Sequence, residues 1–211
     1  MVLPAHIRFK ETIHTPELVA HAVSVLTTAE SERRATFRSV ARQDSFALGR
    51  LAARSLLAEP LECPPPEVPL EVLPDGSIRV PGTPWQLSIS HSGPYAAAAI
   101  ATSEIGLDLE RIRRRPESLF RFILHPEEMT LLDRVDLPTE HQIVLFWALK
   151  ESVLKAKRTG LRLSPKTLRL TVDLDAGTAR IVGQSSWESR FELRDDHILA
   201  VSWPTAESAE Y

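Results

Sequence analysis

The chain has almost none of the cysteine that covalent cross-links require. Its 211 residues contain a single cysteine, Cys63, which excludes an internal disulfide and is typical of a reducing compartment. No apolar run approaches the length of a membrane span, and residues 1–12 lack the apolar core of a secretion signal. The net charge of −3 gives no general attraction to nucleic acid or to an anionic membrane. We therefore expect a cytoplasmic protein without a nucleic-acid or membrane partner.

Common catalytic signatures are also missing. Nothing in the sequence resembles a Walker phosphate loop, a Gly-x-Ser-x-Gly elbow or a dinucleotide-binding fingerprint. The composition, 43% apolar and 25% charged, is nevertheless that of an ordinary globular protein that can bury a core. An active site must therefore be sought among polar side chains scattered over predicted strands and helices.

An internal repeat indicates two similar halves. Gly177 follows Gly76 by 101 positions, each in a predicted hairpin turn, and a tryptophan opens a pair of strands soon after each glycine. This pattern predicts an α+β protein made of two pseudo-symmetric halves with a ligand-binding cleft between them. The expected division is an N-terminal half (1–104), a C-terminal half (105–203) and a flexible tail (204–211).

Periodicity and turn residues place helices within these halves. Helical patterns cover residues 28–59, with a break near 39–44, and a further one covers about 138–157. Shorter helices are expected at about 116–123 and 126–135. The polar side chains of interest can thus be assigned to strands, helices or turns.

Three acids stand out in the C-terminal half. Asp108 and Glu110 alternate with apolar residues in a predicted strand over 105–110, so both point to the same side. Two such carboxylates repel each other unless a cation or basic side chains lie between them. With Glu151 they offer three hard oxygen ligands and no competing Cys or His cluster, which favours Mg²⁺ shared with phosphate groups. Structural salt bridges to nearby arginines are the alternative interpretation.

The predicted helix 138–157 carries further charges. It is apolar over most of its girth, so Lys150, Glu151 and Lys155 should face a site rather than open water. The Glu151–Lys155 spacing is also the commonest stabilising pair on solvated helices, and that explanation remains open.

Candidate anion-binding residues occur in the N-terminal half. Ser90 and His91 lie at the end of a predicted strand, where hydroxyls, imidazole and backbone amides could hold a phosphate, although a simple polar turn is equally consistent. Arg42, at the predicted helix break, could bind a ligand phosphate bidentately. Arg50 and Arg54 lie on an apolar helix and are expected to pair with carboxylates internally.

A run of arginines follows the predicted acid-bearing strand. Residues 111–115 contain four arginines, which is most often the mark of a solvated loop. The alternative is a docking surface for an acidic partner protein.

Taken together, these motifs form an ordered set. Residues 105–110 read Ile-Gly-Leu-Asp-Leu-Glu, and residues 146–155 read Phe-Trp-Ala-Leu-Lys-Glu-Ser-Val-Leu-Lys. Ser-Ile-Ser-His-Ser-Gly at 88–93, the Leu-Gly-Arg at 48–50 and Phe-Ile-Leu-His-Pro-Glu-Glu at 122–128 complete it. The set resembles the signature of the surfactin-type (Sfp-like) 4'-phosphopantetheinyl transferases from about residue 31 to 163. Each block is weak by itself, whereas the ordered set is specific.

This resemblance implies an activity. Such enzymes are pseudo-twofold monomers that bind coenzyme A and Mg²⁺ between their halves, with Mn²⁺ as another usable metal. They move the 4'-phosphopantetheine arm onto a serine of an apo acyl, peptidyl or aryl carrier protein and release adenosine 3',5'-bisphosphate. The N-terminal half would take the adenosine and its 3'-phosphate, and the C-terminal half would hold the metal and the catalytic groups.

The resemblance also implies roles for individual residues. The metal ligands would be Asp108, Glu110 and Glu151. The catalytic residues would be Glu151, Lys155 and Lys150. The coenzyme A contacts would come from Arg42, Ser90, His91, Lys150 and Lys155.

The sequence departs from the family pattern after the first hairpin. The lysine that often follows the glycine is absent beside Gly76, where the nearest basic residue is Arg79. Glu127 and Glu128 could act in the site or simply cap a helix. Two other functions were weighed, a catalytically silent module that binds carrier proteins and an Mg²⁺-dependent phosphohydrolase. The complete acid triad argues against the first, and the lysines with no nucleophile motif argue against the second.

Overall fold

The computed structural model describes residues 1–130, 132 and 137–205, which fall into two compact units. One unit is Pro4–Ser103, and the other combines Met1–Leu3 with Glu104–Tyr211. Each unit contains helices and one five-stranded antiparallel sheet. The expected α+β class with two similar halves is therefore confirmed.

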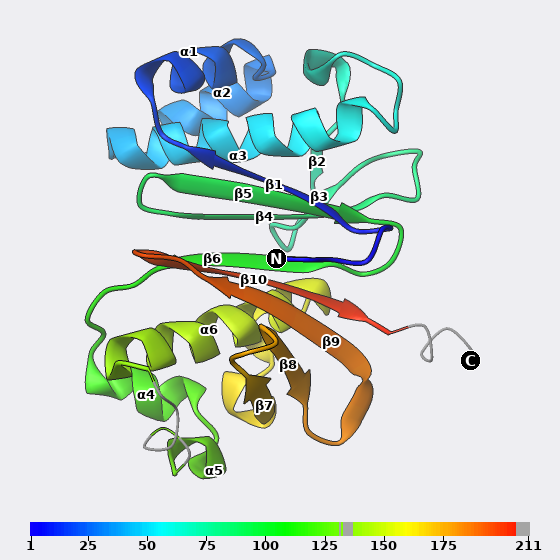
Figure 1. Ribbon diagram of the computed structural model, residues 1–211. Coiled ribbons are helices and arrows are strands. Elements are labelled where there is room, and N and C mark those ends of the chain that lie inside the picture. Colours follow the sequence, from blue (N-terminus) through cyan, green and yellow to red (C-terminus); the bar gives the residue numbers. More distant parts are fainter. Residues whose placement is uncertain (131, 133–136, 206–211) are drawn as a thin grey trace. The chain divides into compact units, whose positions relative to one another are not determined.

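In the first unit, helix α3 lies across one face of the sheet (Figure 1). The strand order is β1-β5-β4-β3-β2. The strands are β1 (Arg8–Ile13), β2 (Glu71–Val72), β3 (Ile78–Arg79), β4 (Gln86–Ser92) and β5 (Tyr95–Ala101). The helices are α1 (Pro16–Ser24), α2 (Thr28–Ala35), α3 (Val40–Ala58) and the short 3-10 helix η1 (Pro65–Glu67). Leu48, Leu51 and Leu57 of α3 are buried against this sheet, because they recur at helical spacing on one face.

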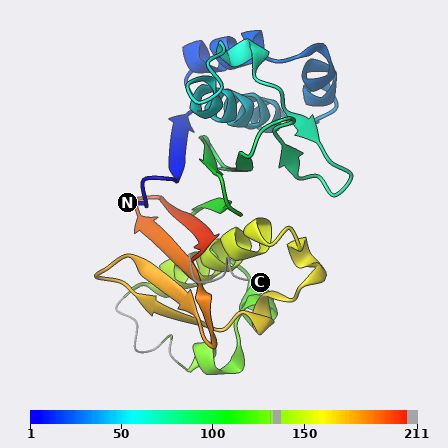
Figure 2. The ribbon, with the colours of Figure 1, turned by 90° about the vertical axis from the view of Figure 1, so that its right-hand side faces the viewer.

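The second unit repeats this arrangement, with α6 packed on β6 and β10 (Figures 1 and 2). Its strand order, β6-β10-β9-β8-β7, is that of the first sheet with every number raised by five. The strands are β6 (Gly106–Arg111), β7 (Leu170–Asp173), β8 (Thr178–Ile181), β9 (Gln184–Leu193) and β10 (His197–Pro204). The helices are α4 (Glu117–Ile123), α5 (Pro126–Met129), α6 (Thr139–Ala156), η3 (Gly160–Arg162) and η4 (Pro165–Thr167). The matching topology is what a duplicated α+β unit produces.

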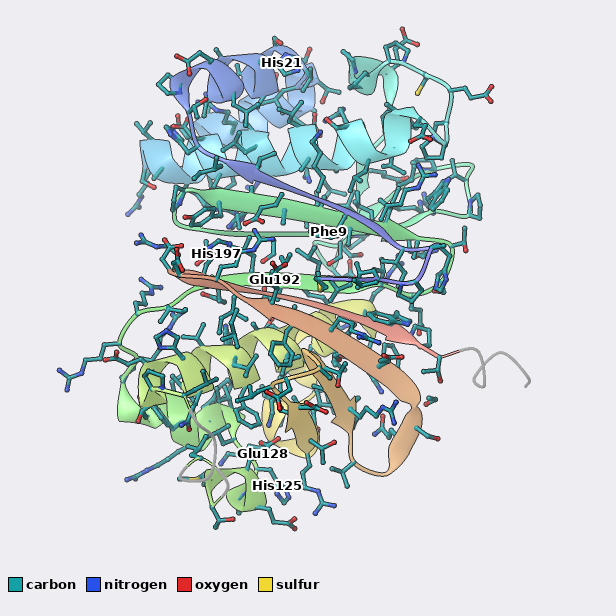
Figure 3. The ribbon with its side chains drawn as sticks, in the orientation of Figure 1. Phe9, His21, His125, Glu128, Glu192 and His197 are labelled. Carbon is teal, nitrogen blue, oxygen red and sulfur yellow. The ribbon has the colours of Figure 1, made fainter. Side chains whose placement is uncertain are left out.

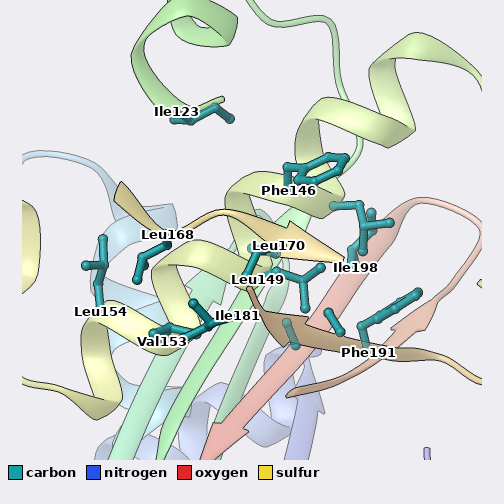
Figure 4. Close-up of a cluster of buried hydrophobic side chains, with 14 of the residues drawn as sticks. Ile123, Phe146, Leu149, Val153, Leu154, Leu168, Leu170, Ile181, Phe191 and Ile198 are labelled. Atoms are coloured by element: carbon teal, nitrogen blue, oxygen red, sulfur yellow. The ribbon is translucent and has the colours of Figure 1, made fainter. Parts of the chain in front are cut away.

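The core of the second unit forms around α6. Leu149 of this helix lies beside Leu170 and Ile198 of the sheet, and all three are at most 2% exposed (Figure 4). Burial of large aliphatic side chains of this kind stabilises a fold by roughly 1.5–3 kcal/mol each. Core packing thus holds in place the helix that carries Glu151 and Lys155.

Several predicted boundaries shift in the structure. The expected break at 39–44 is shorter, because Ser39 caps α3 and the helix begins at Val40. Of the expected helix 126–135, α5 forms the first turn, while residues 131 and 133–136 lie outside the described residues. Pro204, expected to belong to the tail, is the last residue of β10, and residues 206–211 of the expected tail lie outside the described part.

None of the helices described here is both long enough and apolar enough to span a bilayer.

Candidate functional site

The predicted acid-bearing strand, β6, lies unusually close to helix α6. A Cβ atom on Gly106 would lie 1.8 Å from the carbonyl oxygen of Ser152 and 2.5 Å from the amide nitrogen of Ala156. Only glycine permits this backbone-to-backbone approach. The hydroxyl of Ser152 also lies 2.6 Å from that of Ser202, which is paired with Gly106 across the sheet. This contact sets the separation between the β6 acids and the charges of α6.

Asp108 and Glu110 both point toward α6, as the alternation along the strand predicts. Lys155 donates from Nζ to Oδ1 of Asp108 at 2.6 Å and to the carbonyl of Leu107 at 3.1 Å. Glu110 accepts from Nε1 of Trp147 at 3.1 Å and from Nη2 of Arg115 at 2.6 Å. Each carboxylate therefore has its own cationic partner, which offsets the repulsion between them.

Glu151 completes the acidic group from α6. Burial raises the pKa of this carboxyl, and the negative charge of Asp108 raises it further. Lys155 acts in the opposite direction, and Glu110 adds a smaller upward contribution. The three acids are thus close enough to repel one another, and the half-buried Glu151 gains the most from a nearby cation.

The donor set suits a hard divalent cation, although the side chains are not arranged around one. Among the residues that the structure describes, no group of three or more His, Cys, Asp or Glu side chains has the geometry to hold a metal. The carboxylate oxygens of Asp108, Glu110 and Glu151 are nevertheless the ligand type that Mg²⁺ prefers, and after burial the charges of Asp108 and Glu110 also raise the pKa of Glu151. The metal assignment stays a prediction.

Lys150 occupies a different environment from the one predicted for it. Its side chain is completely buried, and Nζ donates to Glu128, also completely buried, and to the carbonyl of Ile123 at 2.7 Å. Burial lowers the pKa of Lys150, and the hydrogen bond and charge of Glu128 partly restore it. The predicted role of Lys150 toward a pyrophosphate does not agree with this position, since a side chain with no exposed surface cannot reach a ligand.

Glu128 is the centre of a structural network, and it lies next to His125 at α5 (Figure 3). Its carboxylate accepts from the backbone amides of His125 and Leu170, each at 2.7 Å, in addition to Lys150. The bond to His125 belongs to a capping box at the start of α5. Of the two explanations considered for Glu128, helix capping is the one that this geometry bears out.

The first unit contains a basic pocket of about 400 Å³. Arg42 and His91 both line it, with Nη1 of Arg42 donating to Nε2 of His91, and the Arg42 guanidinium lies 4.7 Å from the centre of the Phe37 ring. Burial, followed by the positive charge of Arg33, lowers the pKa of Arg42. The full lining is Arg33, Phe37, Arg42, Phe46, Arg50, Val72, Gly76, Ile78, Ile89 and His91.

Ser90 is separated from this pocket. Ile89 and His91 line the pocket, so Ser90, between them on β4, points to the opposite face of the sheet. Its side chain is buried, with 7% of the residue exposed. Arg42, Ser90 and His91 were predicted to bind the same part of a ligand. The structure brings Arg42 and His91 together in the pocket and places Ser90 outside it.

Sequence reasoning missed the aromatic part of this pocket. The Phe37 and Phe46 rings are tilted by 55° with 5.4 Å between their centres, and Arg33 and Arg50 lie over them at 5.3 and 4.8 Å. The sequence contained a signal for Phe46, because Arg50 lies four positions later on the same helix, whereas Phe37 lies beyond the end of α2.

The second unit resembles a known family. Residues 104–202, just under half of the chain, match the model of the 4'-phosphopantetheinyl transferase superfamily. We call these residues the matched segment. The matched segment includes Asp108, Glu110, Glu151 and Lys155, whereas the pocket around Arg42 lies outside it.

Individual proteins extend the similarity beyond the matched segment. A Synechocystis sp. protein provisionally assigned as a 4'-phosphopantetheinyl transferase is 27% identical over 205 residues, which are 87% of this chain and 81% of that protein. The 4'-phosphopantetheinyl transferase psf-1 of Bacillus pumilus is 29% identical over 133 residues, 60% of this chain and 56% of that protein. The holo-[acyl-carrier-protein] synthase of Thermotoga maritima aligns with 20% identity and a TM-score of 0.41. The alignment covers 49% of this chain and 64% of that structure, less than two thirds of its length.

The matched segment also contains a second pocket, of about 450 Å³, beside the arginine-rich loop. Arg114, Arg115 and Arg121 line it together with Phe120 and Met129. Met129 is 43% exposed, and the neighbouring Phe122 is 45% exposed. This surface therefore combines positive charge with exposed apolar side chains, which a purely solvated loop does not need.

Proposed function

We propose that this protein transfers the 4'-phosphopantetheine arm of coenzyme A to a serine of an apo carrier protein and releases adenosine 3',5'-bisphosphate. The observation that supports this most directly is that the superfamily match spans the four charged residues gathered between β6 and α6. The activity assigned to the relatives from Synechocystis sp. and Bacillus pumilus agrees with this proposal.

The acidic group would hold Mg²⁺, or Mn²⁺ in its place. Asp108, Glu110 and Glu151 would be its ligands, and the ion would neutralise the diphosphate of coenzyme A. Lys155 keeps Asp108 in place on β6 and contributes the positive charge nearest to it, which favours a departing phosphate in the same region.

Glu151 is the residue best suited to accept a proton from the carrier serine. A general base is most effective when its pKa approaches the working pH while it is still ionised. In the metal-free protein, burial and the neighbouring acids raise the pKa of Glu151, which opposes the lowering that bound Mg²⁺ would cause. We assign no chemical role to Lys150, because its ammonium group forms a buried ion pair with Glu128.

The basic pocket of the first unit would receive the adenosine end of coenzyme A. Arg42 and His91 offer hydrogen-bond donors to a phosphate, and Phe37 and Phe46 offer apolar ring surface. Its positive lining matches the negative charge of a phosphorylated nucleoside.

The carrier protein would approach the arginine-rich surface of the matched segment. Carrier proteins are typically acidic, so Arg114 and Arg121 would speed the encounter, and added salt would slow it. We expect the enzyme to work as a cytoplasmic monomer, in line with its lone Cys63.

The experiment mixes the purified protein with coenzyme A, Mg²⁺ and apo carrier proteins of the fatty-acid, polyketide and peptide types. Intact-mass spectrometry should show at least one carrier gaining a phosphopantetheine arm. Absence of this mass gain with every carrier would refute the proposal, and release of free phosphopantetheine instead would indicate a hydrolase.

A matched pair of variants tests the acidic group. Asp108→Asn should abolish transfer, while Asp173→Asn, an exposed carboxylate on β7 of the same unit, should leave it unchanged. A fully active Asp108→Asn protein would overturn the assignment of the metal ligands.

A further inference from the structure

The carboxylate of Glu110 is held by two side chains of the second unit. Its Oε1 accepts a hydrogen bond from Nε1 of Trp147 at 3.1 Å, and its Oε2 accepts one from Nη2 of Arg115 at 2.6 Å. The ion pair is sheltered, since the side chain of Arg115 is 14% exposed and that of Glu110 is 20% exposed. A charged pair that water screens only in part interacts more strongly than one at the open surface. A cation of the protein itself therefore occupies one of the predicted metal ligands.

Arg115 belongs to a segment that is neither helix nor strand. Strand β6 ends at Arg111, helix α4 begins at Glu117, and residues 112–116 connect them. Lys155, which pairs with Asp108, lies instead on α6, the helix around which the core of this unit forms. A side chain on a connecting segment changes position at lower cost than one on a packed helix. Of the two cations, Arg115 is thus the more easily displaced from its carboxylate.

Arg115 also lines the second pocket, of about 450 Å³, together with Arg114, Arg121 and the exposed Glu140. Nε of Arg115 is buried and has no hydrogen-bond acceptor among the residues that the structure describes. The contact with Glu110 therefore satisfies the donors of this guanidinium only in part. A guanidinium that turned into the pocket would gain water for this nitrogen and would share the pocket with the carboxylate of Glu140.

We propose that Arg115 is a positioning residue that acts through Glu110: it holds this carboxylate in the metal-free protein and thereby weakens the binding of a divalent cation to the acids of β6 and α6. The inference rests on the proposed function, in which Asp108, Glu110 and Glu151 take Mg²⁺. A cation that binds there must share or replace the hydrogen bond from Arg115, and the charge of the guanidinium repels it. The ion pair is thus an autoinhibitory contact, which is relieved when Arg115 turns into the second pocket.

Binding of Mn²⁺ in the absence of coenzyme A and carrier protein tests this without any transfer reaction. Electron paramagnetic resonance measures the free aqueous ion, and the bound fraction gives the Kd. Arg115→Met should lower the Kd on the order of 10-fold, because one positive charge is removed from beside a doubly charged ion. Loss of a contact that only supported the fold would weaken the site instead, so the direction of the change separates the two roles.

Arg113→Met is the matched control. Arg113 is an exposed residue of the same connecting segment and is not among the residues that line the second pocket. The variant removes the same charge from the same segment, but salt screens an exposed charge effectively. We therefore expect its Kd for Mn²⁺ to stay within about threefold of the wild-type value. An equal gain in affinity in both variants would show a general effect of charge and would overturn the inference.

A double variant tests whether Arg115 acts through Glu110. Glu110→Gln removes the charge that anchors Arg115, so adding Arg115→Met to it should lower the Kd by less than about threefold. A gain as large as that in the wild-type background would contradict the assignment.

A second variant guards against loss of folding. Arg115→Gln keeps a donor for Glu110 without the charge, so it should also bind Mn²⁺ more tightly than the wild-type protein. Circular dichroism establishes that each variant is folded before titration. Unchanged or weaker binding in a folded variant of Arg115 would refute the inference.

The two proposals fail in different ways. If carriers gain the arm but Arg115→Met binds Mn²⁺ no more tightly than wild type, only the inference about Arg115 is wrong. If Arg115→Met binds Mn²⁺ more tightly but no carrier gains the arm, the proposed transfer is wrong and the control of the metal site by Arg115 stands. If neither the wild-type protein nor the Arg115 variants bind Mn²⁺, the inference is wrong, and the carrier assay decides the proposed function by itself.

Discussion

Replacing Lys150 with methionine tests whether this residue supports the fold or the chemistry. The structure shows both Lys150 and Glu128 with no exposed surface, so Lys150→Met leaves a carboxylate buried without its cation. Removing one member of a buried pair costs about 3–5 kcal/mol. Glu128 keeps its two backbone amide donors, so we expect about 3 kcal/mol, near the lower end of that range. Total stabilities are about 5–15 kcal/mol, so this loss would be large.

Urea unfolding followed by tryptophan fluorescence measures the effect. Trp147, Trp187 and Trp203 lie in the second unit and Trp85 in the first, so the signal reports mainly on the unit that contains Lys150. With a slope of about 2 kcal/mol/M, the midpoint should fall by roughly 1.5 M.

The control and the double variant separate the two interpretations. Lys166→Met, which alters an exposed lysine of the short helix η4 in the same unit, should shift the midpoint by less than about 0.5 M. Adding Glu128→Gln to Lys150→Met should recover much of the lost stability, because no charge then stays buried. A Lys150→Met protein with wild-type stability and a raised KM for coenzyme A would refute this reasoning and would indicate that Lys150 contacts coenzyme A.

Two further predictions concern the contact between β6 and α6. Gly106→Ala should lower the free energy of unfolding by about 3 kcal/mol or more, because the new Cβ would meet backbone atoms of Ser152. Gly49→Ala should lower it clearly less in the same urea assay, because its Cβ would meet only a side-chain atom of Ile89, at 2.8 Å. Glu151→Gln should raise the melting temperature of the metal-free protein at pH 8. The pKa of Glu151 in the folded state is raised above its ordinary value of 4.5. The folded state therefore binds more protons than the unfolded state, and it loses stability as the pH rises from 4.5 through the raised pKa. The gain should vanish below about pH 4, where the carboxyl is protonated in both states, and a gain that persists there would contradict the assignment.

Much of the acidic site could be predicted because it depends on local patterns. Alternation along a strand was enough to place Asp108 and Glu110 on one side, and the apolar girth of α6 was enough to indicate that Lys155 faces them. The internal pairing expected for Arg50 and Arg54 is confirmed by their shared contact with Glu30. These conclusions require only the period of a strand or a helix.

Other features depended on partners that the sequence does not reveal. Helical periodicity gives the direction of Lys150 only relative to its own helix, and its partner Glu128 comes from a separate segment whose packing could not be foreseen. The neighbours Ser90 and His91 were expected to hold one phosphate together at the end of a strand, but β4 continues to Ser92, so the two side chains face opposite sides of the sheet. Periodicity predicts which face of a helix or strand carries a residue, whereas long-range packing determines which other segments contact that face.

The strand order of the second sheet also constrains how the protein folds during synthesis. In that sheet β6 is an edge strand whose neighbour is β10, so residues near 108 pair with residues near 200. During synthesis the acid-bearing strand must wait for about ninety further residues to leave the ribosome before its hydrogen-bonding partner exists. Nascent chains that stop short of β10 would consequently expose an unpaired hydrophobic strand, and quality control should recognise such truncated products readily.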